Sequence, residues 1–117
     1  MENDQIYKST AERIMNSGYE KAEDMYSNWA EYVSDIENGT DFLKSVYFND
    51  DGTPVYDTIL EHLVCDLGMT KMHQYPEDVI GEDASDEEYE CYNWMDDLEV
   101  ADLMEEGIKK YLDTKYK

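Results

Sequence analysis

The sequence has few of the residues that build disulfide frameworks, membrane spans or secretory leaders. Cys65 and Cys91 are its only cysteines, too few for a disulfide framework. No apolar run approaches the roughly 20 residues that a transmembrane helix needs. The first residues, Met1 to Asp4, are acidic and lack the apolar stretch of a signal peptide. We therefore expect a cytoplasmic protein with no membrane partner and with both thiols reduced.

Positive charge is also scarce. Nine Lys and Arg face 30 Asp and Glu, which gives a formal net charge of -21. This charge repels phosphates, so it argues against direct binding to nucleic acid or to anionic lipid. It favours a cationic protein partner, because opposite charge accelerates encounter and orients the complex. Nucleic-acid-binding proteins are partners of that kind, since their binding channels are already positive.

A halophilic domain is an alternative explanation of the charge. Halophilic proteins are acidic over their whole surface, and they are usually poor in Lys and in large aromatic residues. This chain has 11 Tyr and two Trp, and all but one of its cations are Lys. The composition therefore favours a partner for the negative charge over adaptation to salt.

Catalytic signatures are absent from the sequence. It contains two His and a single Arg, and it has no Gly-rich phosphate loop, HExxH motif or Ser/His/Asp signature. Carboxylates are so numerous that no pair of them indicates an acid/base couple. We expect that the protein is not an enzyme and that it has no cofactor.

Two conceivable metal sites fail on residue spacing. If Gly52 took the sixth position of a calcium loop, Tyr47 and Thr58 would stand at the first and twelfth positions, where acids are required. Four residues of the types that bind zinc, His62, Cys65, His73 and Cys91, occur without the known zinc spacings. We interpret Cys65 as a small buried apolar side chain instead.

The length and periodicity predict one all-α domain, residues 1–117, with about five helices and an acidic surface. The first helix is expected at about 4–17, ended by Gly18, and the second ends at Asn38-Gly39. A short third helix is expected after Thr40-Asp41. The fourth runs from Pro54 to Leu67, ends at Gly68, and forms the centre of the core.

Residues 69–84 are predicted to be a loop, with Val79 and Ile80 folded back onto the core. A fifth helix follows to about residue 113. Ser85 and Glu88 have the spacing of a capping box at its start. Breaks in this helix are expected near Asp96-Asp97 or near Gly107.

The negative charge is concentrated in one segment. From Glu77 to Glu106 there are 14 Asp or Glu and no Lys or Arg. A solvated helix face is the ordinary explanation, but such a face usually mixes signs and gains from ion pairs four residues apart. Acids on helices lie about 5–6 Å apart, and a DNA strand carries one phosphate per roughly 3.4 Å. A rigid helical array of carboxylates can therefore approximate a phosphate backbone.

We predict that these acids, together with the acidic face of the second helix, bind the partner collectively. Interleaved aromatic side chains would serve as anchors, with Tyr26, Tyr32, Tyr89, Tyr92 and Trp94 as candidates, while Trp29 is expected in the core. The predicted partner-binding acids are Glu20, Glu23, Asp24, Glu31, Asp35, Glu77, Asp78, Glu82, Asp83, Asp86, Glu87, Glu88, Glu90, Asp96, Asp97, Glu99, Asp102, Glu105 and Glu106.

Two stretches, residues 40–60 and residues 93–104, resemble the Ocr antirestriction proteins of coliphages. The first stretch, from Thr40 to Leu60, is similar to that family's central acidic helix and Pro-Tyr segment, and the second is similar to its late helix of Trp and acids. This resemblance implies a dimeric helical mimic of bent DNA that blocks type I restriction enzymes. The chain departs from the family at its end, where Lys115-Tyr116-Lys117 replaces a very acidic tail.

Two functions are consistent with these observations. The first is a phage-type inhibitor that occupies the DNA- or RNA-binding channel of a host defence or repair protein, such as a restriction–modification complex or a CRISPR effector. Anti-CRISPR proteins share this physical logic, and such an inhibitor would act in the host cell cytoplasm, with a homodimer expected. The alternative is an acidic helical adaptor that binds a basic partner while nucleic acid stays bound.

Overall fold

The computed structural model describes residues 2–35, 45–68, 71 and 74–116. These residues are mostly helical (81%), and no strand occurs among them beyond an isolated bridge between Phe48 and Pro54. The all-α prediction is confirmed. The described part contains six helical segments rather than about five, namely residues 45–47 and α1 (Glu2–Asp35), α3 (Tyr56–Leu67), α4 (Pro76–Ile80), α5 (Asp86–Trp94) and α6 (Asp97–Tyr116).

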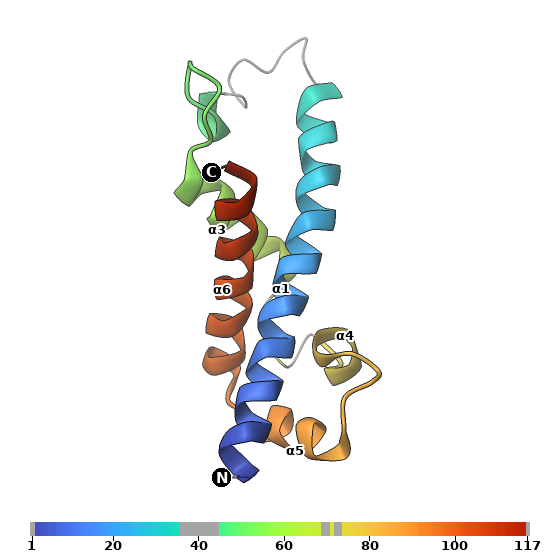
Figure 1. Cartoon of the computed structure of the whole chain (residues 1–117). Coiled ribbons are helices and arrows are strands. Elements are labelled where there is room, and N and C mark those ends of the chain that lie inside the picture. The colour runs from blue at the N-terminus through green and yellow to red at the C-terminus, as the bar shows by residue number, and fades with distance from the viewer. Residues whose placement is uncertain (1, 36–44, 69–70, 72–73, 117) are drawn as a thin grey trace.

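The two longest helices, α1 and α6, lie side by side and run in the same direction (Figure 1). Tyr7 on α1 donates a hydrogen bond to Glu99 near the start of α6. Further along, the rings of Tyr19 and Tyr111 are 5.5 Å apart. The remaining helices pack around this pair, with α4 and α5 beside the first half of α1 (Figure 1).

Two glycines, Gly18 and Gly107, allow α1 and α6 to approach closely, and Gly18 corrects the sequence prediction. Gly18 does not end a helix, because α1 continues through it to Asp35. A Cβ at Gly18 would lie 2.5 Å from the carbonyl oxygen of Met104, and one at Gly107 would lie 2.0 Å from that of Met15. Both glycines therefore lie where the two helices cross. The close approach requires the absence of a side chain at these positions and does not depend on the backbone freedom of glycine.

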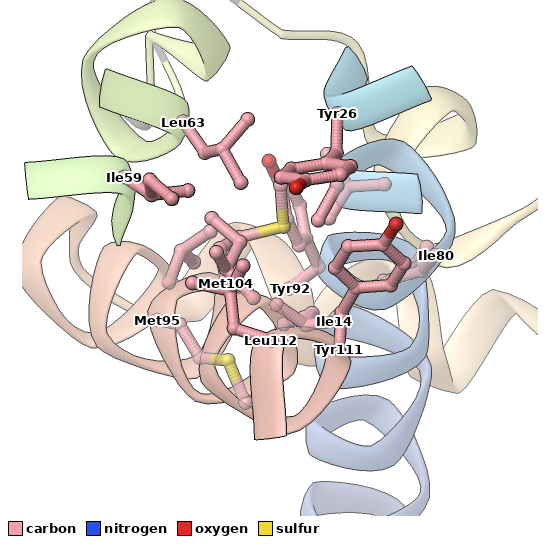
Figure 2. Packing of buried hydrophobic residues seen from close by; sticks show 14 residues of the cluster. Ile14, Tyr26, Ile59, Leu63, Ile80, Tyr92, Met95, Met104, Tyr111 and Leu112 are labelled. Atoms are coloured by element: carbon pink, nitrogen blue, oxygen red, sulfur yellow. The ribbon is translucent and has the colours of Figure 1, made fainter. Parts of the chain in front are cut away.

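The core lies between α1 and α6 and is closed by the shorter helices (Figure 2). Helix α6 contributes the most to it, while α3 contributes Ile59 and Leu63 as its fully buried residues. The sequence prediction that 54–67 forms the centre of the core is therefore wrong. The buried set is Ile14, Ala22, Tyr26, Ile59, Leu63, Val79, Ile80, Tyr92, Met95, Val100, Met104, Ile108, Tyr111 and Leu112.

The ends of the helices match several local predictions. The capping box at Ser85 and Glu88 is present, and Gly68 ends α3 in the left-handed conformation with φ 56°. The expected break at Asp96-Asp97 separates α5 from α6. There the buried side chain of Met95 anchors the turn, and the Asp96 carboxylate accepts a hydrogen bond from the backbone N–H of Glu99 at 2.8 Å.

Other boundaries differ from the prediction. Helix α3 begins at Tyr56 and not at Pro54, which pairs with Phe48 in the bridge. The predicted loop at 69–84 contains α4, and the expected burial of Val79 and Ile80 is confirmed. The helix predicted to begin at Thr40-Asp41 lies outside the described residues, apart from the helical residues 45–47. Among the described helices, none combines the length and the apolar character needed to cross a bilayer.

Candidate partner-binding surface

Most of the predicted partner-binding acids are exposed. The exposed ones are Glu20, Glu23, Asp24 and Glu31 on α1 and Glu77, Asp78, Glu82, Asp83, Asp86, Glu87, Glu90, Asp96, Asp102 and Glu106 on the later segment. Three others are half-buried, namely Asp97, Glu99 and Glu105. Asp35 is the last residue of α1, and its side chain lies outside the described part of the structure.

Glu88 corrects the predicted set, because it is buried, with 8% of the residue exposed. Its carboxylate is 2.9 Å from Nε of Arg13 and accepts a hydrogen bond from the Ser9 hydroxyl at 2.9 Å. Burial raises the pKa of Glu88, but the bonds from Ser9 and Ser85 and the charge of Arg13 outweigh burial and leave the pKa below its usual value. Glu88 therefore holds α5 against α1 and is not part of the exposed set.

Three acids at the turn between α5 and α6 also have structural contacts. Asp96 caps the start of α6, and Asp97 accepts a hydrogen bond from the backbone N–H of Lys71 at 3.2 Å. Glu99 accepts a hydrogen bond from the hydroxyl of Tyr7. That bond, followed by burial and the negative charge of Glu99, raises the pKa of Tyr7. These carboxylates are partly engaged by the fold and less available to a partner.

Acids of α4 and of the turn that follows it lie close to α5. We name the exposed acids of this region the α4–α5 acidic surface. It comprises Glu77, Asp78, Glu82, Asp83, Asp86, Glu87 and Glu90. Tyr89 lies beside three of them: burial raises the pKa of its hydroxyl first, and the charges of Glu77, Glu82 and Asp83 raise it further. The same hydroxyl donates to the carbonyl oxygen of Gly81 at 3.0 Å, which ties α5 to the end of α4.

Cations are scarce around this surface. Among the described residues, no exposed acid of the α4–α5 acidic surface forms a salt bridge. Arg13 contacts Glu88 and donates to the carbonyl oxygen of Ile80 at 2.9 Å. Burial lowers the pKa of Lys21 overall, although the charge of the nearby Asp78 acts to raise it. The surface therefore keeps most of its negative charge.

A second group of acids follows the exposed side of α1. Glu20, Glu23, Asp24 and Glu31 stand at helical spacings of three, four and seven residues, and all four are exposed. Glu23 lies close enough to α6 for its charge to contribute to the raised pKa of Tyr111, after burial and Tyr26. The α1 acids are thus on the helix against which α4 and α5 pack.

The aromatic candidates divide into two groups. Tyr26 and Tyr92 are buried in the core, so they are not anchors for a partner, and Tyr89 is half-buried and bonded to Gly81. Tyr32 and Trp94 are exposed, with Trp94 81% exposed. Trp29 packs against other aromatic rings, including that of Tyr47 at 4.8 Å.

Sequence reasoning missed four exposed apolar side chains, Tyr7, Val46, Tyr75 and Leu98. The periodicity allows Leu98 a place on the inward stripe of the last helix, but the break at Asp96 rotates it outward, where it is 77% exposed. Cys65 is exposed and not buried as predicted, because the inward face of α3 is set by Ile59 and Leu63.

Among the described residues, no three His, Cys, Asp or Glu side chains are grouped as a metal site requires. His62 lies 3.1 Å from Asp66 and packs against the Trp29 ring, while His73 is outside the described residues. In the comparisons with known proteins, no family model, curated protein or solved structure matches the chain. The surface itself is therefore the basis for assigning a function.

Proposed function

We propose that this chain binds a basic, nucleic-acid-binding protein and occupies its channel as the phosphates of a nucleic acid would. One observation carries the proposal: the carboxylates of the α4–α5 acidic surface are exposed, three of them lie near Tyr89, and within the described residues they form no salt bridge. A surface that serves only solubility gains from mixed signs and ion pairs, and this surface forgoes both.

The helical frame supports the proposal. Carboxylates one helical turn apart are separated by about 5–6 Å, a spacing comparable to the roughly 3.4 Å phosphate step of one DNA strand. The molecule measures 54 × 26 × 22 Å, so its long axis corresponds to about 16 such steps. The short helices that carry these acids pack against α1, and such packing reduces the entropy lost when a partner binds.

The class of target is a narrower part of the same proposal. We infer a host defence or repair protein, such as a restriction–modification complex or a CRISPR effector, from the resemblance of residues 40–60 and 93–104 to the Ocr family. The homodimer that this resemblance implies is likewise a prediction. The charge argument for a basic partner does not depend on the resemblance, because it rests on the -21 charge and on the exposed acids.

The decisive experiment is displacement. Bacterial DNA-binding proteins are loaded on a duplex-DNA resin and eluted with this protein, or with polyglutamate at equal total charge. We expect the protein to release a small set of proteins that polyglutamate leaves bound. For a protein identified in this way, competition against fluorescent DNA is then measured at low and high salt, and the competition should weaken as salt rises.

Two matched variants locate the surface. Replacing Glu77, Glu82 and Asp83 with Lys, and separately replacing the exposed Asp50, Asp57 and Glu61 with Lys, changes the net charge of -21 by +6 in both cases, to -15. We expect the first variant to lose displacement and the second to keep most of it. Equal loss in both would show that only total charge matters. A complex that forms while DNA stays bound would support the adaptor instead.

A further inference from the structure

The exposed side of α5 borders a hollow that the acidic surface alone does not explain. The hollow has a volume of about 590 Å³ and lies between the beginning of α1 and α5. Its lining combines apolar, aromatic and acidic side chains, namely Ile6, Tyr7, Glu87, Glu90, Cys91 and Trp94. This mixture differs from the rest of the acidic surface, because a flat indole ring stands beside two carboxylates.

The register of α5 creates this arrangement. Glu87, Glu90, Cys91 and Trp94 are spaced at i, i+3, i+4 and i+7, which places them on one face of the helix. The opposite face carries the buried Glu88 and Tyr92. The helix ends at Trp94, and the chain then turns through extended Met95, so the indole stays uncovered and 81% exposed.

The two carboxylates of the hollow are open to a ligand. Both Glu87 and Glu90 are exposed, and among the described residues neither forms a salt bridge or a side-chain hydrogen bond. The neighbouring acid Glu99 is instead held by the hydroxyl of Tyr7, which fixes the side of the hollow formed by α1. Negative charge and an aromatic face are thus available together at one place.

An arginine side chain meets both requirements at once. Its guanidinium is planar, stacks on an indole face, and donates two parallel hydrogen bonds to a carboxylate. A lysine ammonium is a compact and strongly hydrated charge that satisfies only the electrostatic part. A second copy of this chain is disfavoured at the hollow, because it would bring further carboxylates against Glu87 and Glu90.

We propose that the hollow of Trp94, Glu87 and Glu90 is an anchor site for an arginine side chain of a basic protein partner. This inference rests on the proposed function for the identity of the partner, but the preference for arginine is a property of the hollow itself. It makes Trp94 the aromatic anchor of the acidic surface and the two glutamates its charge-pairing groups.

The test uses the full chain with Trp29→Phe, so that Trp94 is the only fluorophore of its kind. Two five-residue peptides are titrated, one with two arginines and one with two lysines, each separated by glycines and equal in charge. We expect the arginine peptide to change Trp94 emission and to bind about two- to fivefold more tightly than the lysine peptide. Equal affinities for the two peptides would overturn the proposal.

Three variants separate the contributions of the side chains. Trp94→Ala should abolish the preference for arginine while leaving weak binding of both peptides, which is measured by calorimetry because the fluorophore is gone. Glu87→Gln together with Glu90→Gln should weaken both peptides. Tyr75→Ala, which removes an exposed aromatic side chain at the start of α4 and outside the lining of the hollow, should change neither affinity. Retention of the arginine preference in Trp94→Ala would also overturn the proposal.

Failure of this inference can be distinguished from failure of the proposed function. If the protein displaces DNA from a partner but shows no arginine preference, the mimicry stands and the anchor site is wrong. If the arginine preference holds but no DNA is displaced from any protein, the anchor site stands and the mimicry is wrong. Chemical shifts of the Trp94 indole during the same titrations test the anchor site in the unaltered chain, without any substitution.

Discussion

Arg13 and Glu88 join the first and fifth helices through the only arginine of the chain. Nε of Arg13 lies 2.9 Å from the Glu88 carboxylate, and its Nη1 donates to the carbonyl oxygen of Ile80 at 2.9 Å. One side chain thus connects α1, the end of α4 and the capping box of α5. The chain has 30 acidic residues, and the contact with Arg13 accounts for the burial of one of them, Glu88.

Removing the Glu88 carboxylate should therefore destabilise the fold. Glu88→Ala breaks the pair with Arg13, the bond from Ser9 and one half of the capping box, and we expect a loss of about 1–3 kcal/mol in the free energy of unfolding. Urea unfolding followed by circular dichroism measures this loss. The adjacent Glu87→Ala is the control, since Glu87 is exposed and its replacement should stay within about 0.5 kcal/mol.

The same carboxylate makes part of the stability depend on pH. The pKa of Glu88 in the folded chain lies below its usual value of 4.5, so the folded state favours the ionised form. This contribution is fully present above pH 4.5 and is lost as pH falls through the folded pKa. The stability difference between the parent and Glu88→Gln should shrink below pH 4.5, and a difference that stays constant with pH would contradict this assignment.

The crossing of α1 and α6 predicts a strong effect at Gly107. A Cβ there would lie 2.0 Å from the carbonyl oxygen of Met15, so Gly107→Ala must separate the helices. We expect a loss of at least about 1–3 kcal/mol, despite the better helix propensity of Ala. Ser27→Ala, an exposed position on α1, is the control and should be neutral or slightly stabilising. Thermal unfolding of the two variants distinguishes a clash from a propensity effect.

Tyr92 offers a stabilising substitution. Its side chain is 1% exposed, and its hydroxyl has no hydrogen-bond partner among the described residues. Tyr92→Phe removes a buried polar group without opening a large cavity, so the free energy of unfolding should rise by about 1 kcal/mol. Tyr32→Phe, at an exposed position, should leave stability unchanged. A loss of stability in Tyr92→Phe would indicate that the hydroxyl is satisfied in solution.

Salt distinguishes self-repulsion from halophily. The net charge of -21 opposes folding, and the Debye length falls from about 30 Å at 0.01 M to about 8 Å at 0.15 M ionic strength. We expect the melting temperature to rise over this range and then to level off. A steep rise that continues to molar salt would favour a halophilic domain over the proposed function.

The sequence predicted those features of the fold that depend on interactions between residues close together in the chain. The capping box at Ser85, the left-handed Gly68 and the break at Asp96 depend on residues within one or two turns, and all three are confirmed. The prediction that Gly18 ends a helix is wrong, because the role of Gly18 depends on contact with another helix. Nothing in the local sequence distinguishes a glycine that ends a helix from one that lets two helices touch.

The sequence predicted only part of the candidate surface. The segment from Glu77 to Glu106 is acidic in any fold, so the exposure of most of its carboxylates could be expected. The burial of Glu88 depends on Arg13, which lies 75 residues earlier in the chain, and the exposure of Trp94 depends on the turn at Met95. Periodicity alone predicts neither a pair between side chains far apart in the sequence nor the direction of the chain after a helix ends.

The shared direction of α1 and α6 has an electrical consequence. Both helices begin at the end of the molecule where α5 lies (Figure 1). The positive poles of two helix dipoles, each equivalent to about half an elementary charge, therefore lie near the region richest in carboxylates. Because the effect of a helix dipole falls off within the first turn, this positive charge acts on Asp97 and Glu99 at the start of α6, where the backbone offsets part of the repulsion between neighbouring carboxylates.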